Sequence, residues 1–511
     1  MKKLKTMLAL LLILALVLAL AAGCASTSGE PTGSDSSSEN TSGEIDTGAA
    51  EDEEATPIVF IMRDLRSRGE FSEAVEEKIH EIALEEANVD VDIQWVTFGD
   101  WQNKVMLTIS SGEQVDVMHL GWNNNVTTMY AAGQLLDISE ELQEYAPDAI
   151  QIMADYMGTY TFGDGVYGVP TNRNFCKNGY ILMRKDILDE LGLTEKAENL
   201  TSFTEYEEIL AAVKENYTDI YPFGSPNGLA NDFYIFNGDS FADVDVYDNL
   251  GGSMIYCKDD QVQIITDLDC YEEQCARVAK WMDNGWVWPD SVITQDTSDD
   301  VLRQGVAFSN TVGSEHGVEV TKSQAYGFDV VVAKFCDGMV KTGQPSSHGI
   351  GVPVTSEEPE AACKFINLLY TNSEIMNLLI WGIEGDDYTL EDGQIVLSDA
   401  NDAYYEGDFL VGNNLLLTPL AGNGADFYEQ VAEINATAVR SEYLGFAFDA
   451  TDMDDVVSQI SAVTDEYSKS IVAGGYTADG YAAYKEKLEV AGIRDFQAAY
   501  QTQLDAWLAS K

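Results

Sequence analysis

The sequence of 511 residues contains 87 acidic and 28 basic residues, which gives a formal net charge of −59 at pH 7. A chain this acidic repels phosphate backbones and anionic lipid headgroups, so nucleic-acid binding is excluded. With 45% hydrophobic residues the composition is globular, and the length predicts at least two lobes.

The N-terminus has the pattern of an export signal. Three lysines precede an apolar run over residues 7–22, which is shorter than a membrane-spanning helix requires. Small residues lead to Cys24, and this arrangement resembles the lipobox of bacterial lipoproteins, with Ala21 in the place usually held by leucine. The resemblance implies that residues 1–23 are a signal peptide, cleaved after Gly23, and that Cys24 carries a lipid. The alternative is a non-lipidated signal with a chance cysteine.

The segment 24–56 is predicted to be a disordered acidic linker. Ser, Thr, Gly, Asp and Glu dominate it, and Ile45 is its one large aliphatic residue, so it cannot bury enough apolar surface to offset its ordering entropy. We interpret it as a stalk between the lipid and a folded body. Without the signal peptide the chain retains 25 basic and 87 acidic residues, a net charge of −62.

Strands and helices alternate in the first part of the body. Apolar runs and apolar–polar alternation predict strands over 57–62, 89–95 and 115–120, and helical spacing predicts helices over 70–87, 100–111 and 124–132. This order is typical of an α/β lobe with a parallel sheet.

Two glycine-rich passages, 163–170 and 349–353, each lead into a proline. We interpret them as chain crossings between two lobes that close on a ligand. A further strand is predicted over 180–184, and Asp392-Gly393 predicts a hairpin. Three amphipathic helices are expected from Phe427 to the end of the chain.

We therefore expect an α/β fold of two lobes joined by a hinge. The first lobe is predicted over 57–172 and is completed by 305–355. The second lobe is predicted to begin with 173–304 and to continue through 356–511, which includes the C-terminal helices.

Four stretches match a known family: 178–193 (NGYILMRKDILDELGL), 355–390, 445–476 and 484–510. In these stretches the chain resembles the extracellular solute-binding lipoproteins of ABC importers (family 1), of the oligosaccharide-uptake class and the LipO type. The WGIEG run at 381–385 together with the C-terminal stretch is the more specific part of the match.

This resemblance implies a two-lobe, periplasmic-binding-protein-like fold with a LipO-type helical region at the C-terminus. It implies a monomer, held by Cys24 at the outer face of a bacterial cell membrane, that captures an oligosaccharide and delivers it to a membrane permease. Neither enzymatic activity nor a cofactor is expected. Some relatives carry an Asp/Asn-rich calcium loop, but none precedes residues 221–224, so no metal site is expected.

Ligand sites in open α/β lobes lie at the carboxyl ends of strands, where aromatic rings and planar polar groups can contact a sugar. Trp122 and Asn123 follow one predicted strand, Asp64 and Arg66 follow the first strand, and Asn310 follows a third. We expect all five to contact the ligand. The alternative for Trp122 is packing inside the lobe.

Two other places offer candidate ligand contacts. Asn172 and Arg173 follow the first crossing, where a hinge faces the cleft, although they also suit hydrogen bonding within the hinge. Trp381, Glu384 and Tyr388 lie in the run WGIEGDDY, whose glycines permit close approach of a ligand. The alternative for Trp381 is a place at the end of a core helix.

Arginines near predicted strand ends leave the charge of the ligand open. Arg63, Arg66, Arg68 and Arg173 suit a carboxylate or phosphate group. The acidity of the body argues the other way, so neutral and uronate-bearing oligosaccharides both remain open.

Six cysteines lie in the body of the chain, and none has the CxxC spacing typical of zinc sites. Disulfides form readily outside the cell, but a body of this size does not need them. We expect mostly buried free thiols.

A sensory or adhesive glycan-binding lipoprotein is one alternative function, and a glycoside-active enzyme is another. A glycosidase needs two carboxylates beside one bond, and sequence proximity cannot select them among 87 acidic residues. No HExxH, GxSxG or phosphate-loop pattern is present. Peptide import fits the resemblance less well than oligosaccharide import.

Overall fold

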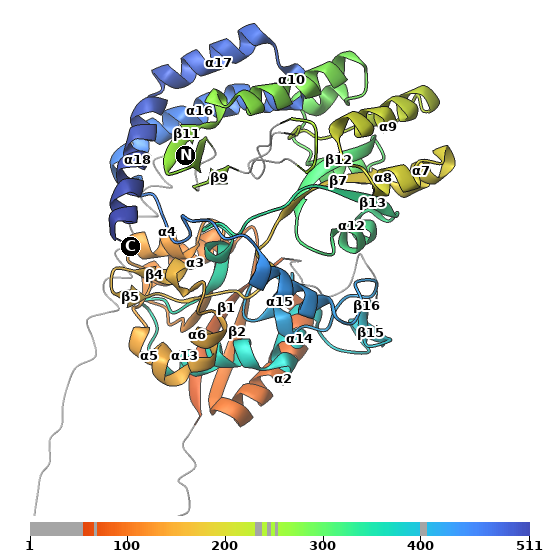
Figure 1. Ribbon diagram of the computed structural model, residues 1–511. Coiled ribbons are helices and arrows are strands. Elements are labelled where there is room, and N and C mark those ends of the chain that lie inside the picture. The colour runs from red at the N-terminus through yellow and green to blue at the C-terminus, as the bar shows by residue number, and fades with distance from the viewer. Residues whose placement is uncertain are drawn as a thin grey trace, which may run out of the picture. The chain divides into compact units, whose positions relative to one another are not determined.

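The computed structural model describes residues 55–65, 69–229, 238–242, 247–250, 254–398 and 406–510 (Figure 1). The predicted signal peptide, Cys24, most of the linker, Arg66 and Arg68 lie outside the described residues. In the described part, no helix combines the length and the apolar character that crossing a membrane requires.

The first sheet has five strands in the order β2 (Val89–Thr97), β1 (Thr56–Asp64), β3 (Val117–Gly121), β14 (His348–Gly351) and β6 (Val169–Pro170). The first three strands are parallel, and β14 runs antiparallel to both of its neighbours. The three strands predicted before residue 121 are confirmed. They are apolar because helices cover the sheet and bury it, as is usual for parallel strands.

Seven helices belong to the first sheet in the described part of the chain (Figure 1). They are α2 (Gly69–Ala87), α3 (Trp101–Ser111), α4 (Val126–Ala131), α5 (Ser139–Tyr145), α6 (Pro147–Ile152), α13 (Pro359–Thr371) and α14 (Ser373–Trp381). The short hairpin of β4 (Thr161–Phe162) and β5 (Gly165–Val166) follows α6. The core between sheet and helices is built on Phe60 of β1, whose ring lies 5.7 Å from that of Phe365 of α13.

The second sheet has the order β13 (Val330–Cys336), β7 (Asn178–Arg184), β12 (Ala307–Ser314) and β8 (Tyr221–Phe223). Its helices are α7 (Lys185–Leu191), α8 (Thr194–Glu198), α9 (Phe203–Asn216), α11 (Ser298–Arg303) and α12 (Val318–Tyr326). Strand β7 is central and antiparallel to both neighbours, and its side chains Ile181 and Met183 are fully buried. The sheet therefore has its own hydrophobic core.

The course of the chain after residue 304 differs from our expectation. We expected 305–355 to complete the first lobe, but β12 and β13 both pair with β7 in the second sheet, and only β14 pairs with β3. We expected 356–511 to lie in the second lobe, but α13 and α14 pack against α2 in the first. Apolar periodicity predicts that a strand or helix forms, but it does not reveal which sheet that element joins.

The two glycine-rich passages lie side by side, because Ile350 of β14 pairs with Val169 of β6. Gly168 has φ +148°, and a Cβ atom there would collide with the carbonyl oxygen of Ile350. Glycine thus allows the two backbones to approach. The chain leaves the first sheet from β6 toward β7 and returns from β13 to β14, so the predicted crossings are confirmed.

The C-terminal helices form a third cluster together with elements from residues 248–283, and this cluster has its own buried core. It is called the C-terminal region below. It consists of α10 (Asp269–Asp283), α16 (Asp454–Ser470), α17 (Ala478–Val490), α18 (Ile493–Ser510) and the small sheet of β9 (Asp248–Asn249), β10 (Ile255–Lys258) and β11 (Gln261–Ile264). With α15 (Phe427–Thr437), four helices rather than three follow residue 426 in the described chain. Tyr271 of α10 packs in this core, whereas Trp281 of the same helix packs in the core of the second sheet.

The predicted hairpin is confirmed as β15 (Tyr388–Glu391) and β16 (Gln394–Leu397). Asp392 and Gly393 both have positive φ, as a two-residue hairpin turn requires.

All six cysteines of the body are buried and free, as expected. Burial raises the pKa of the Cys257 and Cys270 thiols to about 11. It raises the pKa of Cys275, Cys336 and Cys363 to about 12, so these thiols stay protonated at neutral pH.

Candidate ligand-binding site

Trp122 occupies the carboxyl end of β3 with an unusual backbone conformation. In the described residues, positive φ outside glycine occurs at Asn88, Trp122, Asp259, Asp260 and Asp392. Asn and Asp tolerate this region, whereas for a bulky residue the left-handed conformation costs roughly 1–2 kcal/mol. Trp122 has φ +50° and keeps 37% of its surface exposed. Strain of this kind clusters at ligand sites, and this one lies where such a site is expected.

The asparagines after Trp122 fix the turn that presents the ring. Gly121 and Asn124 exchange backbone hydrogen bonds of 3.1 and 3.0 Å. The Asn125 amide donates to the carbonyl oxygen of Trp122 at 2.8 Å, and its Oδ1 accepts from the backbone N–H of Thr128 at 3.0 Å, which caps α4. The polar run after Trp122 thus forms a turn and a helix cap.

Aromatic rings and a buried arginine pack around the indole of Trp122 and fix its position. The ring of Trp122 lies 4.5 Å from that of His348 and 5.3 Å from that of Phe98, both edge to face. The Arg63 guanidinium lies 4.4 Å from the Trp122 ring centre and 4.7 Å from that of Trp101. Phe98 is itself 52% exposed, so two aromatic faces meet solvent at the edge of the first sheet.

The charge at the base of this aromatic group is buried. Arg63 is 3% exposed, and burial lowers its pKa to about 10. Nε2 of His119 lies 3.4 Å from Nδ1 of His348, and burial lowers the pKa of His119 to about 3. The histidine pair is therefore neutral at physiological pH, and Arg63 supports the rings from inside the protein.

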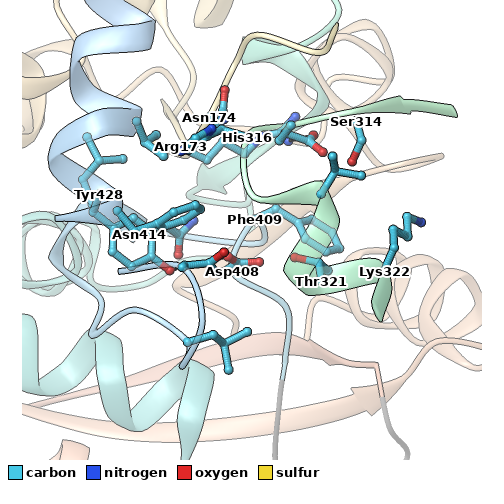
Figure 2. A pocket seen from close by; sticks show the side chains of 17 residues that line it. Arg173, Asn174, Ser314, His316, Thr321, Lys322, Asp408, Phe409, Asn414 and Tyr428 are labelled. Atoms are coloured by element: carbon cyan, nitrogen blue, oxygen red, sulfur yellow. Dashed lines mark hydrogen bonds and ion pairs between the residues drawn. The ribbon is translucent and has the colours of Figure 1, made fainter. Parts of the chain in front are cut away.

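A cavity of about 250 Å³ lies beside this aromatic group (Figure 2). The end of β12, the start of α12, α15 and the connecting segment from residue 408 onward form its wall. Its polar lining includes Arg173, Asn174, Glu315, Asp408, Asn414 and Asn423. Its aromatic lining includes Phe409, whose ring lies 5.2 Å from His348 and 6.2 Å from Trp122. Phe409 thus joins the cavity and the exposed aromatic rings into one wall.

Arg173 enters the cavity from the crossing between β6 and β7. Its Nη2 donates to the Ser347 hydroxyl at 2.8 Å and to the Gln344 carbonyl oxygen at 3.2 Å, and its Nη1 lies 3.6 Å from Glu315. It is 7% exposed, and desolvation lowers its pKa. Arg173 therefore lines the cavity, with Nη2 hydrogen-bonded within the protein, Nη1 ion-paired with Glu315 and Nε without a hydrogen-bond partner.

Asn172 links two connecting segments. Its backbone N–H donates to Gly412 and its carbonyl oxygen accepts from Asn414, both at 2.9 Å. Its side-chain amide donates to Oδ1 of Asn413 at 2.9 Å. The structure thus places Asn172 in hydrogen bonding between connections, which was the alternative for this residue.

Apart from Arg173, the predicted contacts in the described residues do not line the cavity. Trp381 and Asn310 are fully buried, and the Asn310 amide donates to the Ser298 carbonyl oxygen at 2.9 Å. Asp64 is 2% exposed, so it lies inside the protein at the end of β1. Glu384 is exposed and Tyr388 half-buried on the hairpin side of α14.

Asn123 is exposed next to Trp122, whereas Arg66 lies outside the described residues. The strand-end rule thus found two exposed residues, Trp122 and Asn123, whereas Asp64 is buried at the end of β1 and Asn310 is buried within β12, which continues to Ser314.

Several residues of the aromatic group and of the cavity lining escaped prediction. Phe98 follows β2 directly, so the same strand-end rule applied to that strand would have found it. Glu315 follows β12 in the same way. Phe409 and Asn414 lie in an irregular connection, where no periodicity marks a position near the cavity.

Comparison with known proteins identifies the family of this chain. The family model "Bacterial extracellular solute-binding protein" matches residues 67–376, well over half of the chain. The chain belongs to this family of solute-binding proteins. A second model, "Domain of unknown function (DUF3502)", matches residues 442–509, which include α16, α17 and α18.

Relatives of this solute-binding protein include a carbohydrate ABC transporter substrate-binding protein of Streptococcus pneumoniae. The two are 24% identical over 447 residues, which cover 84% of this chain and 87% of the relative. Among solved structures, the N-glycan transport solute-binding protein NgtS of S. pneumoniae aligns with a TM-score of 0.75 at 20% identity, covering 89% of this chain and 99% of that one.

The S. pneumoniae substrate-binding protein FusA, solved with kestose, aligns with a TM-score of 0.60 at 17% identity, covering 89% of this chain and all of that chain. Together these structures confirm the predicted two-lobe α/β fold.

Proposed function

We propose that this protein is the substrate-binding component of a carbohydrate ABC importer, and that it captures an oligosaccharide against the wall formed by Phe98, Trp122 and Phe409. The observation that carries the proposal is Trp122, an exposed indole held in a strained conformation at a strand end. Aromatic faces stack on the C–H-rich faces of sugar rings, and polar groups beside them bind hydroxyls. The roles named for the S. pneumoniae relatives support the same function.

We place the ligand between two lobes that close on it. One lobe contains the first sheet with α13 and α14, and the other contains β7, β8, β12 and β13 with the C-terminal region. Trp122 belongs to the first, whereas Ser314 and Glu315 at the end of β12 belong to the second. A ligand that touches both sides favours the closed form, because only differential contacts shift such an equilibrium.

Delivery completes the proposed cycle. The lipid on Cys24 and the acidic linker hold the body at the outer face of the membrane, where the loaded protein, as a monomer, meets its permease. The permease then takes up the glycan, and the binding protein performs no chemistry on it.

Two assays test this function. Calorimetry of the mature chain from residue 25 against plant and host oligosaccharides is expected to find a tight ligand that is recovered intact. Deletion of the gene is expected to abolish uptake of that glycan. Release of reducing ends would indicate a glycosidase, and unchanged uptake would indicate a sensory or adhesive role.

The anchor is tested separately. A Cys24→Ala variant is expected to lose labelling by radioactive palmitate and to appear in the medium. Labelling that persists in this variant would contradict lipid attachment at Cys24.

A further inference from the structure

We infer that the cavity selects neutral oligosaccharides and rejects those that carry a carboxylate, and that Glu315 determines this specificity. The inference rests on the proposed function and goes beyond it, since the fold alone does not fix the charge of the ligand. Structures with this fold include NgtS in complex with Man5GlcNAc and the alginate-binding protein AlgQ2.

Glu315 is ion-paired with Arg173 and Lys177, the basic side chains that an acidic sugar would need as partners for its carboxylate. Its Oε1 lies 3.6 Å from Nη1 of Arg173 and 3.2 Å from Nζ of Lys177. The other end of the Arg173 fork donates to Ser347 and Gln344. Binding a carboxylate through two parallel hydrogen bonds requires a free guanidinium edge. Here Nη2 is hydrogen-bonded to Ser347 and Gln344 and Nη1 is ion-paired with Glu315, so each guanidinium edge contains a nitrogen that already has a partner, and Nε is the one nitrogen of Arg173 without one.

Lys322, the other cation of the described cavity wall, is held in the same way. Its Nζ lies 2.5 Å from Oδ2 of Asp299, whose Oδ1 accepts from the Tyr326 hydroxyl at 2.6 Å. Lys322 is therefore neutralised by an acid that faces it from α11.

Acidic groups would also repel an anionic ligand. Glu315 and Asp408 both line the cavity, and the charges of both act on Arg173, whereas Lys322 is paired with Asp299. A carboxylate brought into this wall would meet two like charges without an unpaired cation to offset them. The large negative charge of the whole chain acts in the same direction.

Neutral amides also line the cavity (Figure 2), and some of their hydrogen-bonding atoms have no partner. Asn414 lines the wall and is 1% exposed, yet neither its Oδ1 nor its Nδ2 has a hydrogen-bond partner. Nδ2 of Asn174 is unpartnered as well. Buried polar groups without partners are rare, because each costs about 1–3 kcal/mol. An amide offers one acceptor and two donors, which suits a pair of sugar hydroxyls.

Matched pairs of glycans test the inference by calorimetry on the mature chain from residue 25. The pairs are galactotetraose with tetragalacturonate, xylotetraose with its 4-O-methylglucuronosyl derivative, and lacto-N-tetraose with its sialylated form. In every pair that binds, we expect the acidic member to bind at least 100-fold more weakly. An acidic member that binds as tightly as its neutral partner overturns the inference and leaves the proposed function intact. If no member of any pair binds, the proposed function fails, and the inference fails with it.

Single substitutions identify which side chain determines the preference for neutral over acidic glycans. Glu315→Gln is expected to reduce the discrimination at least tenfold, because it removes the carboxylate that is paired with Arg173 and Lys177. Glu486→Gln on α17 removes the same charge from an exposed position and is expected to leave the ratio unchanged. Asn414→Ala is expected to weaken binding of the neutral glycan at least tenfold. If both glutamate variants behave alike, Glu315 does not determine specificity.

A second measurement needs no variant. Rejection by charge weakens when salt screens the interaction, so the ratio of affinities in wild-type protein is expected to narrow between 0.05 and 1 M NaCl. A ratio that does not respond to salt would contradict rejection by charge.

Discussion

The indole of Trp122 is exposed to solvent, and the backbone of this residue has a strained, left-handed conformation. The side chains below it explain why the ring keeps this position, since Arg63, His348 and Phe98 contact it from three sides. Stability alone would favour Gly or Asn at a left-handed position. The presence of tryptophan there is therefore best understood as a requirement of binding.

Replacing Trp122 separates binding from stability. Trp122→Gly removes the strain, which is worth about 1–2 kcal/mol and offsets part of the packing that is lost. We expect the melting temperature to change by only a few degrees. Stacking a large apolar side chain is worth about 1.5–3 kcal/mol, so affinity for the glycan is expected to fall at least tenfold. Calorimetry and thermal unfolding measure the two effects.

Trp122→Phe is the matched control, because it keeps an aromatic face and should retain most of the affinity. Unchanged affinity in Trp122→Gly would show that the ring does not contact the ligand.

At this scale the sequence reveals only part of the site. Trp122, Asn123 and Arg173 were predicted because they follow strands or a crossing. Trp381 is fully buried in the core at the end of α14, which was the alternative for this residue. Phe409 and Asn414 reach the cavity only through the folding of an irregular connection, which leaves no periodic signal in the sequence.

At the level of secondary structure, the paired strands β6 and β14 link the two segments at which the chain crosses between the sheets. Their glycines permit the close pairing that sets where each crossing begins. Strands and helices before residue 121 were predicted within a few residues, because apolar periodicity is a local property. The return of β12 and β13 to the second sheet was not predicted, because pairing with β7 joins residues far apart in the sequence.

Alanine variants at Gly168 and Gly163 test the close pairing of β6 with β14. Both have positive φ, but a Cβ at Gly168 meets the Ile350 carbonyl oxygen, whereas Gly163 has open space around it. Gly163→Ala is expected to cost about 1–2 kcal/mol from backbone strain alone. Gly168→Ala is expected to lower the melting temperature further, because β6 must move away from β14. Equal melting temperatures for the two variants would show that the close approach contributes nothing.

Over the whole molecule, burial and charge determine the response to pH. The thiols of Cys275, Cys336 and Cys363 have pKa values of about 12 in the folded state, against an ordinary value of 9. Folding therefore favours the protonated form. This contribution to stability is fully present below pH 9 and is lost as pH rises toward 12.

We expect the urea midpoint of the mature chain from residue 25 to fall steadily above pH 9. At pH 8, iodoacetamide is expected to leave all six cysteines unmodified until the protein is unfolded, as mass spectrometry would show. Rapid alkylation of the folded protein would contradict the burial of these thiols.

The central claim is that an oligosaccharide binds between the two sheets against Trp122. A crystal structure of the mature chain with its tightest oligosaccharide from the calorimetric panel tests this most directly. We expect a sugar ring stacked on Trp122 within about 4 Å, with Phe409 and Asn414 also in contact. A glycan bound to another surface, with Trp122 free in solvent, would contradict the claim.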